Sequence, residues 1–283
     1  MQIIGNKNSF RESISTGLVL GPVLVMLIIP FAQAMIFSPP PASYLDGPGV
    51  IKIDVGDGES IRGRYMFNPD AEFTILYNHG NDEDIGMNLH WLQRFGERGF
   101  SVLTYDYRGF GLSDGKPTEK NTYRDAEVVY DYLVSQRNVP PEKVIVMGRS
   151  LGGGVAVELA KNKPVAGLIM QSTFVSINRV VAGGQAVPFD KYKNISKISR
   201  VNCPVLVIHG TDDSRVKFWH GEKLYEAAKQ PKGYLWVKGA DHDDDIAAIA
   251  GEKYWQAIDR MIDKIKKGRD EAETSSRQLD ENK

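Results

Sequence analysis

The sequence predicts an α/β protein with a mostly parallel central sheet and helices on both faces. Short apolar runs, each the length of a buried strand, alternate along the chain with longer segments of helical periodicity. Several runs, such as 144–147 and 205–208, are apolar at every position, as expected for strands covered on both sides. No internal repeat is visible, so we expect one domain over residues 50–266.

The predicted elements follow one another from residue 50 onward. Strands at 50–55 and 62–67 flank the turn Gly56-Asp57-Gly58. Further apolar runs predict strands at 74–78, 102–106, 144–147, 168–170, 205–208 and 235–237. Helical periodicity predicts helices at 89–98, 123–136, 155–161, 218–229 and 246–265.

Composition excludes several classes of protein. The 283 residues carry a net charge of −1, so no overall field attracts nucleic acid and no such partner is expected. Cys203 is the single cysteine and is interpreted as a buried small residue. No histidine and cysteine cluster has the spacing of metal ligands, so we expect no metal and no other cofactor.

The N-terminal segment predicts a link to a membrane. Residues 17–37 are nearly all apolar, and as a helix they would span about 30 Å, one hydrocarbon core. Lys7 and Arg11 precede them, which favours cytoplasmic residues 1–16, a retained anchor and a catalytic domain outside the cytoplasm. Cleavage of a signal peptide near Ala34 is the alternative and would give a secreted or periplasmic protein. A helix buried in the protein core is the third interpretation of this segment.

Three further segments are interpreted from composition and length. Residues 38–49 contain three consecutive prolines and predict a stiff linker. Residues 267–283 are charged, with few apolar residues, and are expected to be disordered. The segment 173–204 is short, which predicts a short cap and a fairly open site, where 185–189 and Tyr192 could line an acyl groove.

The strongest motif is Gly148-Arg149-Ser150-Leu151-Gly152, which matches G-x-S-x-G. A predicted strand precedes it and a predicted helix follows, as a nucleophile at a sharp strand-to-helix turn requires. The glycines leave room for that turn, and the Leu151 N–H at the helix N-terminus can stabilise an oxyanion. The alternatives are a glycine-rich turn without chemistry and a phosphate loop, which lacks its Lys-Ser/Thr pair here.

A nucleophilic serine needs a base and an acid. In α/β hydrolases the order along the chain is serine, acid, histidine. His242 lies between the last strand and the last helix, where the base is expected. Asp213 fits the H-G-x-x-D-x-x-V spacing and is the favoured acid, with Asp212 as the alternative.

The loop after the strand 74–78 is expected to complete the site. The Asn81 N–H is the predicted second oxyanion donor beside that of Leu151. We interpret His79 and His209 as structural, and His220 as an exposed residue of a helix.

Taken together, the motifs resemble those of the Bem46-like α/β hydrolases. The resemblance covers about residues 50–265 and rests on His79-Gly80-Asn81, the segment YDYRGFGLS at 105–113, the G-x-S-x-G motif, His209-Gly210-Thr211-Asp212-Asp213 and Asp241-His242. It implies the α/β-hydrolase fold and a serine hydrolase that cleaves ester or thioester bonds of small acyl or lipid-like substrates through a Ser-His-Asp triad. The family includes membrane-anchored lysophospholipases and protein depalmitoylases, and one N-terminal membrane segment is part of its pattern.

The chain departs from that family pattern in its acidic loops. Three acidic residues, 82–84, follow Asn81, and Asp241 and residues 243–245 surround His242. These carboxylates would repel anionic head groups, unless they are solvated loop charges. Two other functions stay open: a non-catalytic membrane-tethered binding protein on a hydrolase scaffold, and a peptidase of the same fold.

Overall fold

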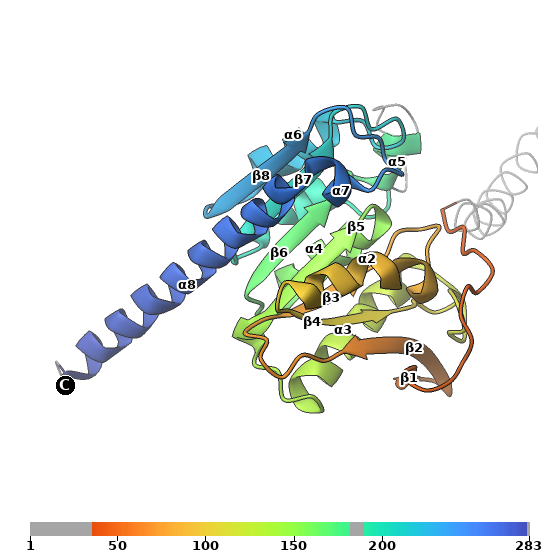
Figure 1. The fold of residues 1–283 in the computed structure, drawn as a ribbon, viewed down its shortest axis with the longest axis horizontal. Helices are drawn as coiled ribbons and strands as arrows, with labels where there is room; N and C mark the ends of the chain where they lie inside the picture. The colour runs from red at the N-terminus through yellow and green to blue at the C-terminus, as the bar shows by residue number, and fades with distance from the viewer. Residues whose placement is uncertain (1–35, 182–189, 282–283) are drawn as a thin grey trace, which may run out of the picture. The chain divides into compact units, whose positions relative to one another are not determined.

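The computed structural model describes residues 36–181 and 190–281 (Figure 1). One eight-stranded sheet runs through it in the order β1-β2-β4-β3-β5-β6-β7-β8. β1 and β2 pair antiparallel, as do β2 and β4, whereas all other neighbours are parallel. The mostly parallel sheet is therefore confirmed. The strands are β1 Ile51–Gly56, β2 Glu59–Met66, β3 Thr74–Asn78, β4 Ser101–Tyr105, β5 Val144–Arg149, β6 Gly167–Gln171, β7 Val205–Gly210 and β8 Lys232–Val237.

Helices cover both faces of the sheet because alternate strand residues point to opposite sides. On one face, Tyr77 and Met147 join a buried cluster with Leu92 of α2 and Tyr254 of α8. On the other face, α4 packs on β5 and β6, and α3 packs on α4. The helices are α2 Ile85–Glu97, α3 Glu119–Ser135, α4 Leu151–Asn162, α5 Ile177–Val181, α6 Trp219–Ala227, α7 Ile246–Ala250 and α8 Glu252–Glu281.

The C-terminal part differs from the sequence prediction in two ways. The single helix expected at 246–265 is divided into α7 and α8 at Gly251, whose φ of 56° lies in the left-handed region. The tail expected to be disordered is helical from residue 267 to Glu281, where α8 ends. Lys266 and Arg269 both pair with Glu72. The tail has few apolar residues that could join a core, but its residues of good helix propensity and these ion pairs favour a helix.

The structure also corrects the prediction at the N-terminus. None of the helices within residues 36–181 and 190–281 is both long and apolar enough to cross a bilayer. This finding contradicts the predicted transmembrane anchor and the single-pass location that followed from it, and both are corrected accordingly. Residues 17–35, on which the prediction mainly rested, lie outside the described residues, as does the alternative cleavage site near Ala34.

Part of the predicted linker is bound to the sheet domain, whose compact unit begins at Pro39. The backbone N–H of Ser43 donates to the carboxylate of Asp84 at 2.6 Å, and its hydroxyl donates to the same carboxylate. The hydroxyl of Tyr44 donates to the buried carboxylate of Asp106. Residues 43–44 are therefore anchored by hydrogen bonds, a pairing that a proline-rich composition does not reveal.

The segment between β6 and β7 contains α5 and two short 3-10 helices, Asn194–Ser196 and Ile198–Arg200. Tyr192, a candidate for lining an acyl groove, is fully buried, and its hydroxyl hydrogen-bonds the Thr122 hydroxyl at 2.8 Å. It therefore cannot line an open groove. The other candidates, 185–189, lie outside the described residues.

Candidate active site

The G-x-S-x-G motif forms a tight turn between β5 and α4. Ser150 has φ 51° and ψ −116°, a strained conformation for a residue with a side chain. A Cβ atom on Gly148 would lie 2.1 Å from the Gly152 carbonyl oxygen, and one on Gly152 would lie 2.1 Å from the Asn78 carbonyl oxygen. Only glycine fits at either position, so the two glycines allow the turn that presents Ser150 at the end of the sheet.

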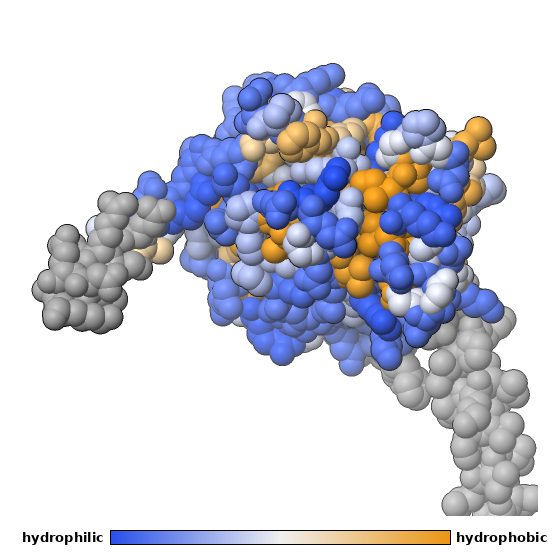
Figure 2. Space-filling model, turned by 90° about the horizontal axis from the view of Figure 1, so that it is seen from below, coloured by the Kyte–Doolittle hydropathy of each residue, from blue (hydrophilic) through white to orange (hydrophobic). Residues whose placement is uncertain are grey.

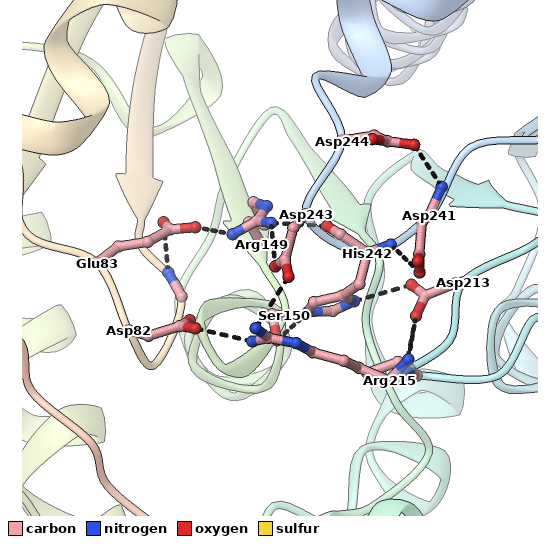
Figure 3. Close-up of polar contacts among 12 residues, drawn as sticks. Asp82, Glu83, Arg149, Ser150, Asp213, Arg215, Asp241, His242, Asp243 and Asp244 are labelled. Atoms are coloured by element: carbon pink, nitrogen blue, oxygen red, sulfur yellow. Dashed lines mark hydrogen bonds and ion pairs between the residues drawn. The ribbon is translucent and has the colours of Figure 1, made fainter.

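Ser150, His242 and Asp213 form one hydrogen-bonded chain (Figure 3). His242 Nε2 lies 3.1 Å from Ser150 Oγ, and His242 Nδ1 lies 2.8 Å from Asp213 Oδ2. Ser150 follows β5, Asp213 follows β7 and His242 follows β8, and the parallel strands bring these loops to one edge of the sheet. The neighbouring Asp212 is exposed and accepts a hydrogen bond from the Thr211 hydroxyl instead.

The environment of Asp213 keeps its carboxyl group ionised. Its Oδ1 accepts the N–H groups of Val216 at 2.6 Å and Arg215 at 3.1 Å, and its Oδ2 lies 3.3 Å from His209 Nε2. Burial raises the pKa of Asp213, but hydrogen bonds from His209 and His242 lower it well below its usual range. The side chain facing His242 is therefore an oriented anion.

Two further buried histidines, His79 and His220, have structural roles. His79 is fully buried, and its Nδ1 lies 2.7 Å from the Gly80 carbonyl oxygen. His220 was expected to be exposed, but it is buried, and its Nδ1 accepts the Val175 N–H at 3.2 Å. Burial lowers the pKa of both His79 and His220 to about 4, so both are neutral near pH 7.

The two predicted oxyanion donors lie in segments that approach each other closely. Leu151 is the first residue of α4, and Asn81 follows Gly80 in the loop after β3. The close contact between Gly152 and the Asn78 carbonyl oxygen shows that this loop packs against the start of α4. The Gly80 N–H donates to Glu83 Oε2 at 2.9 Å, which closes the loop on itself. The oxyanion role of both N–H groups stays a prediction.

A cavity of about 310 Å³ adjoins the turn on the side of Arg149. Trp91, Ile246 and Tyr254 contribute its apolar wall, whereas Arg149 and several carboxylates form its polar wall. On the face shown in Figure 2, hydrophobic residues gather mainly in a strip to the right of the centre, with smaller patches elsewhere among hydrophilic residues.

Two protein families match the chain. The family described as "Serine aminopeptidase, S33" matches residues 69–198, and the family described as "X-Pro dipeptidyl-peptidase (S15 family)" matches residues 170–244. Both matches fall within the sheet domain, and together they cover the strand-to-helix turn and the loops after β7 and β8.

Curated relatives match a larger part of the chain. Alpha/beta hydrolase domain-containing protein aho-3 of Caenorhabditis elegans is 41% identical over 202 residues, which is 70% of this chain and 61% of that protein. Alpha/beta hydrolase domain-containing protein 17B of Homo sapiens is 39% identical over 197 residues, which is 69% of this chain and 66% of that protein. The chain thus spans less than two thirds of the length of each relative.

Solved structures share the fold at low identity. The Pyrococcus furiosus esterase Pf2001 superposes with a TM-score of 0.66 and 19% identity, covering 81% of this chain and 97% of that one. Est1E from Butyrivibrio proteoclasticus, solved with ferulic acid bound, gives a TM-score of 0.61 and 18% identity, with 74% and 99% coverage. With the sheet, the glycine-flanked serine turn and the curated relatives, these matches show that the chain belongs to the α/β hydrolases, as its motifs predicted.

Proposed function

We propose that this α/β hydrolase is a serine hydrolase that cleaves carboxylic ester or thioester bonds through an acyl-enzyme. The observation that carries the proposal is the continuous hydrogen-bonded chain from Asp213 through His242 to Ser150. A serine hydroxyl becomes an effective nucleophile when a neighbouring imidazole accepts its proton. The anionic Asp213 would hold His242 in the tautomer with a free Nε2 and stabilise the imidazolium formed during the reaction.

The reaction proceeds in two halves. Ser150 Oγ attacks the carbonyl carbon while His242 accepts the serine proton, and the N–H groups of Leu151 and Asn81 stabilise the oxyanion. His242 then donates the proton to the leaving alcohol or thiol, and the acyl group stays on Ser150. Water, activated by His242, attacks the acyl-enzyme and releases the acid.

Two findings support small acyl esters or thioesters as the substrate class. Two of the solved proteins with the same fold are described as esterases. The cavity beside Arg149 also offers an apolar wall for one of the groups that flank the scissile bond.

A peptidase is the second candidate, because both matching families carry peptidase descriptions. Rates on ester and amide substrates distinguish an esterase from a peptidase. We expect hydrolysis of p-nitrophenyl and thioester substrates, and no release of p-nitroaniline from aminoacyl or X-Pro anilides. Amide cleavage with kcat/KM equal to that for esters would favour the peptidase.

The decisive experiment is labelling with a fluorophosphonate probe, which reacts only with an activated serine. The wild-type protein should be labelled and should hydrolyse esters, whereas Ser150→Ala should do neither. Ser113→Ala is a matched control. The Ser113 hydroxyl donates to the Asp106 carbonyl oxygen and is not part of the hydrogen-bonded chain that links Asp213, His242 and Ser150. Near-wild-type hydrolysis by Ser150→Ala would refute the mechanism. A wild-type protein that is neither labelled nor active would indicate a non-catalytic binding protein.

A further inference from the structure

Charged residues stand close in sequence to every candidate catalytic position, and their side chains meet beside Ser150 (Figure 3). They come from the loop after β3, the end of β5, the loop after β7 and the loop after β8. We call this group the rim cluster; it consists of Asp82, Glu83, Arg149, Arg215 and Asp243.

Arg215 is the member that joins loops on both sides of the site. Its Nη1 lies 2.7 Å from Asp82 Oδ2, and its Nη2 lies 2.9 Å from Asp243 Oδ2. Figure 3 shows its side chain extending from the Asp213 loop past Ser150 toward Asp82. One guanidinium group therefore connects the loop that carries Asn81 to the loop that carries His242.

Arg149 forms a second, more buried connection between the same loops. It pairs with Glu83, its Nη2 donates to the His242 carbonyl oxygen at 2.7 Å, and the same atom lies 3.8 Å from Asp243. The Arg149 side chain is 13% exposed, whereas that of Arg215 is 51% exposed. Of the two guanidinium groups in the rim cluster, that of Arg149 is thus part of the packed framework and that of Arg215 meets solvent.

Most carboxylates of these acidic loops have partners, some within the rim cluster and some outside it. Asp241 accepts the N–H groups of Ser214 and His242, and Asp245 caps α7 and pairs with Arg94. Asp82 and Asp243 are the two carboxylates balanced by Arg215. Three carboxylates against two guanidinium groups leave the cluster with one net negative charge, which would become two without Arg215.

Folding stability is a poor explanation for this arrangement. Ion pairs between solvent-exposed side chains contribute little to stability, because water screens the charges and ordering the side chains costs entropy. Burial alone would raise the pKa of Asp82, but the hydrogen bond to Arg215 lowers it, so the pair is ionised at neutral pH. A fixed charge pair at this place mainly sets the geometry of the loops. It also determines which charge on an entering group is favoured.

We propose that Arg215 is a positioning and specificity-determining residue, which clamps the Asn81 loop against the His242 loop and limits the negative charge beside Ser150. This inference rests on the proposed function. Arg215 should therefore shift the preference of the enzyme toward neutral and anionic leaving groups and away from cationic ones, compared with a variant that lacks Arg215.

The test compares two thioesters that have the same butanoyl group and are followed by the same thiol assay. One is butanoylthiocholine, with a cationic leaving group, and the other is the butanoyl thioester of N-acetylcysteamine, which is neutral. Arg215→Gln should lower kcat for the neutral thioester and raise the cationic-to-neutral ratio of kcat/KM by about fivefold to tenfold, the size of effect expected for one partly screened charge.

Two further variants separate charge from geometry. Arg215→Lys should restore the selectivity ratio but only part of kcat, because one ammonium group does not reproduce two directed guanidinium contacts. Arg98→Gln is the matched control, since Arg98 also makes a solvent-exposed pair, with Glu252, away from the site. It should leave both kinetic constants and the selectivity ratio unchanged.

The outcomes are distinguishable from failure of the proposed function. Fluorophosphonate labelling of the wild-type protein first establishes an activated serine. If labelling succeeds and Arg215→Gln keeps the wild-type kcat and selectivity ratio, or lowers the melting temperature and both substrates' kcat/KM equally, the role of Arg215 is overturned. If the wild-type protein is not labelled and does not hydrolyse either thioester, the proposed function itself is wrong.

Discussion

Gly152 offers a direct test of how the serine turn is built, through the substitution Gly152→Ala. The added Cβ would lie 2.1 Å from the Asn78 carbonyl oxygen and 2.5 Å from the Asn78 carbonyl carbon and the His79 carbonyl oxygen. All three are backbone atoms, so no side chain can rotate away. Contacts under 3.0 Å are essentially never seen for real Cβ atoms. The start of α4 and the loop after β3 must therefore separate by about 1 Å.

That displacement has two measurable consequences. Overpacking of this kind costs about 1–3 kcal/mol of unfolding free energy, which lowers the melting temperature by about 3–10 °C in a domain of this size. The same shift moves the Leu151 and Asn81 N–H groups apart. A misplacement of about 1 Å in an active site can lower the rate about 100-fold, so kcat for an ester substrate should fall by about that factor.

The assay pairs thermal unfolding with ester hydrolysis, and Gly96→Ala is the control. Gly96 lies near the end of α2, and no atom beyond its own turn of helix lies within 4 Å of an added Cβ. Alanine should leave activity unchanged there and raise stability by up to about 1 kcal/mol. If Gly152→Ala keeps both the wild-type melting temperature and kcat, the account of the turn as a close-packed glycine contact is refuted.

Three other predictions follow from the structure. Asp213→Asn should lower kcat by about 10³–10⁴-fold with little change in KM, whereas Asp212→Asn should stay within about twofold; the reverse ranking would make Asp212 the triad acid. Burial raises the pKa of Glu158, but two lysines lower it to about 2, so its stabilisation is complete above about pH 4.5 and is lost as the pH falls toward 2. Denaturant unfolding should show Glu158→Gln less stable by about 1–2 kcal/mol at pH 7 and by less than half of that at pH 3, and a constant gap would contradict this linkage. Burial raises the pKa of the Cys203 thiol to about 12, so a thiol reagent should modify it only in denaturant and should not inhibit hydrolysis; rapid modification of the native protein would show that the thiol is accessible.

Much of the fold could be predicted because its main signals are local. The strand at 74–78 was predicted with the bounds that the structure has, and apolar runs located the other parallel strands to within a few residues. A buried parallel strand needs apolar residues on both faces, which leaves a continuous run in the sequence. Helix ends were less predictable: α2 begins at Ile85 because the Asp84 side chain accepts the Met87 N–H, and that cap lies before the first clear periodicity.

The sequence predictions were wrong mainly where contacts between residues distant in the chain decide the structure. His220 was expected to be exposed, but it is buried and accepts the Val175 N–H across the fold. The segment after residue 266 has too few apolar residues to form a core, yet it extends α8 and pairs with Glu72, almost two hundred residues earlier. Periodicity describes one segment at a time and cannot report a partner that is distant in sequence.

For the candidate site, the sequence by itself determined the residue types and their order: a serine between close-packed glycines, an acid after a later strand and a histidine before the final helices. These requirements are local, because the turn needs glycine and the chemistry needs an acid and a base. Only the tertiary structure decided that Asp213 rather than Asp212 contacts His242, since adjacent residues on a turn point in different directions. It also decided that Arg215 joins Asp82 and Asp243, because these charges lie far apart in the chain and meet only when parallel strands bring their loops to one edge of the sheet.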